Sequence, residues 1–192
     1  MATKKNKDKV IKGKDKKKYT IHRLWCYDNI YFGIPKRANK KDTHTIVIHN
    51  TGGSQDKAVN TANYFKNNKG RYAGAHFVID ESGTIYQCAR LKDVCYAVGG
   101  VYTKQKGGSK YLNKVTNYNS ISIELNGIID NEPTKKQIAS VKAICDYIKK
   151  YRKIDKIIRH FDVNSKICPQ RYAGALTSKK GKAWTKFKKK IS

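Results

Sequence analysis

The stretch Thr45-Ile-Val-Ile-His49 decides the fold of this chain. Its β-branched residues predict a short buried strand, and residues 50–53 (Asn-Thr-Gly-Gly) carry the signal of a turn. A second run of this kind, Lys156-Ile-Ile-Arg-His160, predicts another strand towards the end of the chain. Each run ends in a histidine that opens a loop. Because α/β proteins usually place their chemistry at strand ends, these two histidines are the first candidates for a functional site.

Strand and helix patterns alternate along the rest of the chain. Residues 75–79 and 84–87 predict a hairpin whose turn contains a glycine, and residues 120–125 alternate as a strand. Apolar residues at helical spacing predict one helix over residues 55–68 and another from Thr134 to about Arg152, opened by a capping box of Thr134 and Gln137. The aromatic segment 24–34 predicts a strand or a packed extended segment. The expected fold class is α/β, a single domain with a central mixed β-sheet flanked by helices.

Both ends of the chain are strongly basic. Residues 1–18 contain nine lysines and almost nothing apolar, which predicts a disordered basic arm. Residues 19–177 then form the expected folded, catalytic domain. Residues 178–192 carry seven lysines and no acid, with Trp184, Phe187 and Ile191 at helix-like spacing, and predict a basic amphipathic tail.

The net charge of the chain favours polyanions as its binding partners. Its 42 Lys+Arg against 14 Asp+Glu give a formal net charge of +28, and such a field attracts polyanions. Nucleic acid, anionic lipid and the teichoic-acid-rich wall of Gram-positive bacteria all fit that description. A simpler interpretation is that the lysines keep the surface solvated. Composition alone does not choose among them.

The cysteines and the N-terminal segment indicate where the chain is made. Five cysteines without regular spacing do not form a disulfide framework, and the absence of a CxxC pair argues against a zinc finger. No apolar stretch follows Lys18, and no run approaches membrane-spanning length. We therefore expect a protein made in the cytoplasm without a signal peptide and without a transmembrane segment.

The histidines and one cysteine are the candidate metal ligands. His22 and His44 lie in basic, exposed sequence and are expected to be inert, while His76 lies within a strand and is better explained as a structural histidine. A catalytic zinc takes three protein ligands and leaves one position open. Cys168 follows His160 by a loop long enough to fold back, so both side chains can reach one ion. The alternative for Cys168 is a small buried hydrophobe.

Four blocks of sequence in a fixed order give a specific resemblance. Together they resemble the type 2 N-acetylmuramoyl-L-alanine amidase family, which includes phage endolysins, bacterial autolysins and the animal peptidoglycan recognition proteins. The match covers roughly residues 44–175, most of the folded part. The blocks are Thr45-Ile-Val-Ile-His-Asn-Thr-Gly-Gly53, Ala75-His-Phe-Val-Ile-Asp80, Asn119-Ser-Ile-Ser-Ile-Glu-Leu125 and Arg159-His-Phe-Asp-Val-Asn-Ser-Lys-Ile-Cys-Pro169.

The resemblance implies a role for five residues. His49, His160 and Cys168 match the three ligands of a catalytic Zn²⁺, which the family holds in a surface cleft. Glu124 matches the general base of bacterial members, and Lys166 matches the lysine that stabilises the transition state. Without the resemblance, Glu124 would be interpreted as a solvent-facing strand residue and Lys166 as one lysine among many.

The chain departs from the family pattern at two places. Phage members place a catalytic tyrosine directly before the histidine of the second block, where this chain has Ala75, and Tyr72 is off register. We therefore assign the proton-handling role to Glu124 and expect the tyrosine role to be vacant or filled from elsewhere. A Trp-His pair of many bacterial members is also missing, replaced by the sequence around residues 95–99.

The implied function is zinc-dependent hydrolysis of the amide bond between N-acetylmuramic acid and L-alanine in peptidoglycan. The expected partners are the wall of Gram-positive bacteria and its anionic polymers, contacted through the basic termini, with no specific nucleic acid. The enzyme would act at the wall after release through a holin-type pore or on lysis. Two alternatives stay open: a non-catalytic peptidoglycan-binding module, and a nucleic-acid-binding protein, although the chain has no RRM, KH or zinc-finger pattern.

Overall fold

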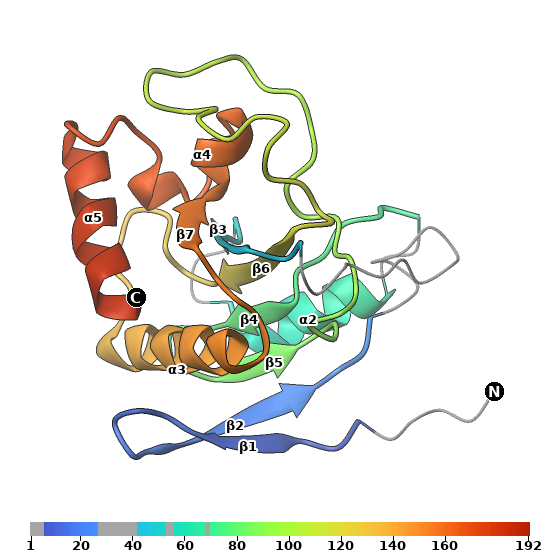
Figure 1. Ribbon diagram of the computed structural model, residues 1–192. Helices are drawn as coiled ribbons and strands as arrows, with labels where there is room; N and C mark the ends of the chain where they lie inside the picture. Colours follow the sequence, from blue (N-terminus) through green and yellow to red (C-terminus); the bar gives the residue numbers. More distant parts are fainter. Residues whose placement is uncertain (1–5, 27–41, 53–55, 68–69) are drawn as a thin grey trace.

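The computed structural model describes residues 6–26, 42–52, 56–67 and 70–192, and these residues build one mixed sheet with helices on both of its faces (Figure 1). The sheet has seven strands in the order β1-β2-β5-β4-β6-β3-β7. The strands are β1 (Lys9–Lys12), β2 (Lys18–Arg23), β3 (Thr45–Asn50), β4 (Phe77–Ile79), β5 (Ile85–Gln87), β6 (Ser120–Leu125) and β7 (Lys156–Arg159). The α-helices are α2 (Ala58–Asn67), α3 (Lys135–Tyr151), α4 (His160–Asn164) and α5 (Lys179–Ile191), and Gln170–Tyr172 forms a 3₁₀ turn.

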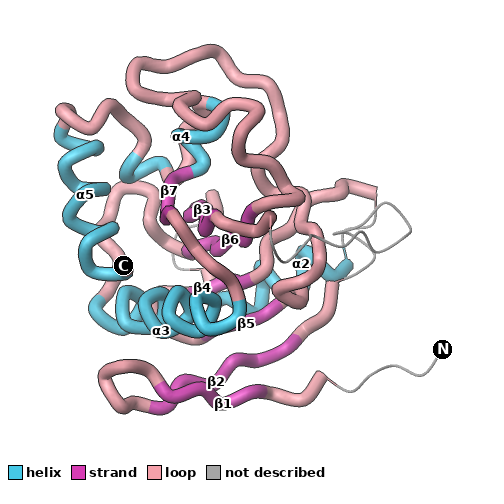
Figure 2. Tube along the Cα trace, viewed as in Figure 1, coloured by secondary structure: helices cyan, strands magenta, loops and turns pink. Residues whose placement is uncertain are grey.

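The centre of the sheet is parallel and its outer part is mixed. Strands β4, β6, β3 and β7 run parallel to one another, while β5 pairs antiparallel with β4 and parallel with β2. The strand–helix alternation of the sequence predicted this α/β architecture, and the expected fold class is confirmed. Figure 2 shows that the chain between β5 and β6 is almost entirely loop.

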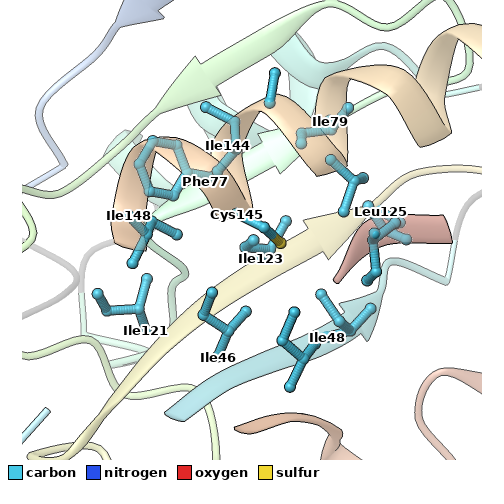
Figure 3. Close-up of a cluster of buried hydrophobic side chains, with 14 of the residues drawn as sticks. Ile46, Ile48, Phe77, Ile79, Ile121, Ile123, Leu125, Ile144, Cys145 and Ile148 are labelled. Carbon is cyan, nitrogen blue, oxygen red and sulfur yellow. The ribbon is translucent and has the colours of Figure 1, made fainter. Parts of the chain in front are cut away.

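The main hydrophobic core lies between the sheet and α3. Alternate residues of the central strands point to this side: Ile46 and Ile48 from β3, and Ile121 and Ile123 from β6, all completely buried (Figure 3). Helix α3 covers them with the apolar stripe that its sequence predicted, which includes Ile144, Cys145 and Ile148. Because successive strand residues point to opposite faces, the residues between these isoleucines face away from the core.

Helix α3 begins with only one of the two hydrogen bonds that make up a capping box. The hydroxyl of Thr134 accepts a hydrogen bond from the backbone N–H of Gln137 at 3.0 Å, as expected for an N-cap. The side chain of Gln137 does not reach back to Thr134. It is buried and donates instead to the carbonyls of Ile79 and Asn126, at 3.0 and 2.9 Å. Gln137 therefore anchors α3 to the ends of β4 and β6.

Helix α5 is part of the core as well as of the surface. Trp184, Phe187 and Ile191 are all buried, and the ring of Phe187 stacks on that of Tyr172 with centroids 5.1 Å apart. The lysines of the helix occupy its other side. The predicted helix is thus confirmed, and the segment 178–192 packs on the domain rather than extending from it.

The expected disordered arm over residues 1–18 is wrong where the structure describes it. Lys9–Lys12 forms β1, which pairs antiparallel with β2, and Ile11 is buried in the main core beside α3. Composition hid this strand because Val10 and Ile11 are the only apolar residues between Thr3 and Lys18 apart from Gly13. In the structure, pairing with β2 and burial of Ile11 accompany its ordering. Residues 1–5 lie outside the described part of the chain.

Most of the other predicted elements are confirmed with small shifts. The hairpin of β4 and β5, strand β6 and helix α2 lie where the patterns placed them. For the segment 24–34, Leu24 and Cys26 continue the pairing of β2 by donating to the carbonyls of Gln87 and Cys88, while residues 27–34 lie outside the described part. Within the described residues, no helix has the length and apolar character needed to cross a bilayer.

We predict that Trp184→Ala lowers the free energy of unfolding by about 3–5 kcal/mol, because it removes a large aromatic side chain from a closed core. Urea denaturation followed by circular dichroism measures this change. Lys189→Ala on the exposed side of the same helix is the matched control and is expected to change stability by less than about 0.5 kcal/mol. An equal, small effect of both substitutions would contradict the packing of α5.

Candidate metal centre

The face of the sheet opposite to α3 carries the polar side chains. On β3, Val47 and His49 alternate with the core isoleucines and therefore point to this second face. His49 lies at the carboxyl end of the strand, directly opposite Glu124 of β6 in the parallel register. Ser122 precedes Glu124 by two residues and shares its face. Three polar groups thus meet on two adjacent central strands.

His160 and Cys168 come from the segment that follows β7. His160 is the first residue of α4 rather than the last residue of the strand, so helix geometry orients its side chain. After α4, Ser165 adopts a left-handed conformation (φ 66°) and turns the chain back. The backbone N–H of Phe161 then donates to the carbonyl of Cys168 at 2.7 Å, which closes the loop. The expectation that this loop folds back on itself is confirmed.

A buried ion pair holds this loop in place. Arg159 is 1% exposed, and its guanidinium binds the Asp162 carboxylate through Nε and Nη2. Its Nη1 donates to the carbonyls of Tyr172 and Gly174, at 2.6 and 2.8 Å. Arg159 therefore connects the end of β7, the first turn of α4 and the segment after Cys168.

The structure brings the three predicted ligands together. The ligand atoms of His49, His160 and Cys168 all lie within 4.8 Å of one another, and all three residues are buried. The His49 Nδ1 to Cys168 Sγ distance is 3.8 Å, and the two imidazole rings have centroids 4.7 Å apart. Zinc–nitrogen and zinc–sulfur bonds of about 2.1 and 2.3 Å in a tetrahedron place such atoms about 3.5 Å apart. The trio therefore has nearly the spacing that one zinc ion needs.

The protonation of the two histidines also suits a metal. Burial lowers the pKa of His160 to about 3, with a further decrease from the charge of Lys166, and the Val98 backbone opposes it. Burial likewise holds the pKa of His49 well below its usual value. Both imidazoles are therefore neutral at pH 7 and can each offer a lone pair. Neither ring nitrogen of His160 makes a well-formed hydrogen bond although both are buried, which a metal bond would compensate.

The thiol of Cys168 is not ionised by its surroundings alone. The charge of Lys166 lowers its pKa. Burial and the charge of Glu124 outweigh it, however, and raise the pKa of the thiol to about 12. The lysine alone therefore does not ionise Cys168, so a bound metal has to displace the proton.

Ser122 orients the first histidine. Its hydroxyl lies 3.2 Å from Nε2 of His49, while the other ring nitrogen, Nδ1, faces Cys168. A hydrogen bond at one ring nitrogen fixes the tautomer and leaves the other nitrogen free to bind a metal. Sequence analysis did not identify this role, although the alternation of residues 120–125 places Ser122 on the same face as Glu124.

Glu124 and Lys166 both lie near the metal ligands. Burial raises the pKa of Glu124 to about 7 and Lys166 opposes this rise, so the two charges act on each other. The Oε2 atom of Glu124 is buried without a hydrogen-bond partner. Lys166 also lowers the pKa of His49, His160 and Cys168, which places its charge beside the whole trio.

Tyr102 is a residue near the site that sequence analysis missed. It lies in the long loop between β5 and β6, with its ring centroid 6.4 Å from that of His160 and 5.9 Å from Nζ of Lys166. Asn164 of α4 fixes this loop by donating to the carbonyls of residues 98–100. The tyrosine is 42% exposed and so offers an aromatic surface beside the ligands. In the sequence, only the length of this loop indicated that one of its residues could lie near the site.

The remaining histidines play no part in the trio. His76 is buried, accepts a hydrogen bond at Nδ1 from the backbone N–H of Ser122 and contacts the Asp93 carbonyl through Nε2. Both of its nitrogens are thus used, and the structural interpretation is confirmed. Ala75, where phage members have a tyrosine, is completely buried among apolar side chains. His22 and His44 pair with surface aspartates.

These features define an α/β protein with a candidate single-metal centre at the carboxyl ends of the parallel strands in the centre of a mixed sheet. Residues 39–171 match the family model described as N-acetylmuramoyl-L-alanine amidase, which is more than half of the chain. The chain therefore belongs to the type 2 N-acetylmuramoyl-L-alanine amidase family, and the resemblance of the four sequence blocks is confirmed.

Similar proteins support both the family and the fold. The N-acetylmuramoyl-L-alanine amidase CwlL of Bacillus licheniformis is 28% identical over 133 residues, 65% of this chain but 35% of CwlL, so the chain spans about a third of that relative. A mutant endolysin from Bacillus subtilis superimposes with a TM-score of 0.60 at 24% identity, covering 91% of this chain and 99% of the other. The endolysin amidase LysCS from Clostridium intestinale URNW gives 0.53 at 22%, covering 78% and 86%. At such identities the structures show a shared fold.

We predict that Ser122→Ala weakens Zn²⁺ binding by about 10- to 100-fold, because His49 loses the hydrogen bond that orients its ring. Competition with a chromophoric chelator measures the affinity. Ser120→Ala is the matched control, since its hydroxyl donates to the Thr116 carbonyl and not to a ligand. If the two variants bind zinc equally tightly, Ser122 does not position His49.

Proposed function

We propose that this protein is a zinc-dependent N-acetylmuramoyl-L-alanine amidase, which hydrolyses the amide bond between N-acetylmuramic acid and L-alanine in peptidoglycan. The observation that carries the proposal is the buried His49–His160–Cys168 trio within a chain of this family. A set of three protein ligands is typical of a catalytic zinc, which keeps one position for water or substrate. The bound ion would polarise the scissile carbonyl and lower the pKa of water to about 7.

Glu124 is the proposed general base. An efficient base has a pKa close to the working pH, and burial raises the pKa of this carboxyl group to about 7. Its position opposite His49 puts it next to the ligands, and its Oε2 has no other partner. Glu124 would take a proton from the attacking water and return it to the nitrogen of the leaving alanine.

Lys166 is the proposed stabiliser of the transition state. Attack on the amide carbon places negative charge on the carbonyl oxygen, and a lysine beside the ligands can offset that charge. A single positioned donor of this kind contributes roughly 3 kcal/mol in well-studied cases, or about 10²-fold in rate. The ammonium group of Lys166 lies 5.9 Å from the centroid of the Tyr102 ring, within the range of a cation–π interaction.

A non-catalytic peptidoglycan-binding module is the alternative within the same family. Such relatives usually lose a metal ligand, whereas this chain keeps the three ligand atoms within 4.8 Å. It also keeps an acid and a lysine beside them. The two functions differ in one measurable property, the release of stem peptides.

The proposed setting is the wall of Gram-positive bacteria, reached after release through a holin-type pore or on lysis. A net charge of +28 favours contact with the anionic polymers of such walls. Because α5 packs in the core, deletion of residues 178–192 is not a clean test of this contact. Charge-neutralising substitutions are the better choice.

We predict that purified Gram-positive sacculi digested with this protein release new N-terminal alanine. A chelator should abolish the release and added Zn²⁺ should restore it, because the proposed reaction requires the bound metal. Labelling of new ends followed by mass spectrometry measures the products. Reducing sugar ends would identify a glycosidase, and intact sacculi would support the binding module; either result contradicts the proposal.

We predict that Glu124→Gln and Cys168→Ala separate metal binding from catalysis. Cys168→Ala removes a ligand and should lower both zinc content and activity, whereas Glu124→Gln should keep stoichiometric zinc and lose at least about 100-fold in kcat. Zinc content is measured by atomic absorption and kcat on the same sacculi. Glu81→Gln in the turn between β4 and β5 is the control. Full activity of Glu124→Gln would remove Glu124 from the mechanism.

A further inference from the structure

Three cavities follow α3 on the side of the molecule away from the metal centre. Their volumes are about 650, 560 and 260 Å³. The largest lies between α3 and β1, the second between the start of α3 and α5, and the third, smallest one between them. In Figure 1, α3 accordingly lies between the β1–β2 hairpin and α5, while α4 and the long loop are at the opposite end.

The three cavities adjoin one another along α3, and together we call them the α3 furrow. The first and the third share Lys14, Ala143 and Asp146. The third and the second share Ile138 and Lys190. The three cavities thus follow one another along the helix from the hairpin to α5, so an extended polymer lying on this side of α3 would meet all of them.

The α3 furrow is strongly basic. Five lysines line the first cavity, four lysines and Arg171 line the second, and four lysines line the third, with Lys14 and Lys190 each lining two. The acids along the furrow are Asp15, Glu132 and Asp146. Lysines are compact, mobile point charges, which suits phosphates that repeat along a flexible polymer.

The acids of the furrow are already engaged. Asp146 is buried between Lys14 and Lys142, each 3.3 Å from one of its oxygens. Glu132 binds Arg171 at 2.7 Å, and Asp15 accepts a hydrogen bond from the Tyr19 hydroxyl. Eleven lysines and Arg171 against three acids leave a strong positive field along both walls of the furrow.

The aromatic residues of the furrow favour a ligand without bases. Single-stranded nucleic acid binds through aromatic rings that are free to stack. Here Lys9 lies over the rings of Tyr147 and Tyr151, with Nζ 4.7 and 5.6 Å from their centroids. Phe187 is buried in the core. Tyr151 keeps an exposed fraction of 46%, but the lysines of the furrow far outnumber its accessible rings.

We propose that the α3 furrow binds a linear polyol-phosphate chain, the polyphosphodiester of Gram-positive walls. The choice of this polymer rests on the proposed function, which places the protein at that wall. The furrow and the metal centre lie on opposite sides of the sheet. A protein held through the furrow therefore keeps its metal edge free for the glycan and its stem peptides.

The test uses two variants of the full chain with equal net charge. The furrow variant carries Lys→Gln at exposed furrow positions, and the control variant carries the same change at exposed positions elsewhere. The furrow set is Lys12, Lys135, Lys150, Lys186 and Lys190. The control set is Lys66, Lys92, Lys114, Lys153 and Lys189.

The probe is glycerol-phosphate teichoic acid released from purified walls and labelled at one end, with binding followed by fluorescence anisotropy. We expect the furrow variant to bind at least about tenfold more weakly at 0.1 M salt, and the control variant to stay within about threefold of the native protein. The slope of log affinity against log salt should fall by about 3 to 4 in the furrow variant, at about 0.7 per lost phosphate contact. Equal weakening of both variants would overturn the proposal.

Two further arms identify the polymer and separate this proposal from the amidase activity. Tighter, furrow-dependent binding of single-stranded DNA with the same number of phosphates, or of phosphatidylglycerol vesicles, would overturn the wall assignment. Hydrolysis is measured on sacculi stripped of teichoic acid, where the furrow variant should match the native protein. Absent hydrolysis with intact furrow binding would refute the amidase alone, and the reverse result would refute the furrow alone.

Discussion

The buried ion pair of Arg159 and Asp162 is the interaction on which the rest of the site depends. A guanidinium that is 1% exposed is tolerated only when its donors are satisfied, and here the carboxylate and two backbone carbonyls accept from it. Those acceptors belong to α4 and to the segment that follows Cys168. The pair therefore fixes both ends of the loop that carries two of the three candidate ligands, and its guanidinium lies 5.7 Å from the Trp184 ring of α5.

The alternation of the central strands separates this chemistry from the core. Isoleucines of β3 and β6 face α3 and are completely buried, while His49, Ser122 and Glu124 face the other side of the same two strands. A shift of either strand by one residue would exchange these two sets and expose the isoleucines, so the hydrophobic core itself holds the register. The position of the metal ligands is in this sense a consequence of core packing.

Local patterns were sufficient for the central strands and α3, whereas the set of candidate ligands came from the family resemblance of the four ordered blocks. Val10 and Ile11 of β1 were missed since two apolar residues among lysines give no period, and only pairing with β2 and contact with α3 order them. Tyr102 was missed for a related reason. Its place beside His160 depends on Asn164 holding the loop by three backbone carbonyls, a contact between distant segments that no local pattern records.

The same division of the sheet explains how one small domain can carry a large positive charge. Lysine side chains on α3 and α5 lie over the outer, solvent side of helices whose apolar sides fill the core, and their aliphatic stems can cover apolar surface while the ammonium groups stay in water. Asp146, buried between Lys14 and Lys142, offsets part of the repulsion between these two lysines. The electrostatic repulsion among the lysines of α3 and α5 therefore acts on the side of the sheet that these helices cover. At the metal edge, by contrast, Lys166 adds a positive charge beside the candidate ligands. The negative charges of Glu124 and of a Cys168 thiolate would offset both this charge and that of a bound cation.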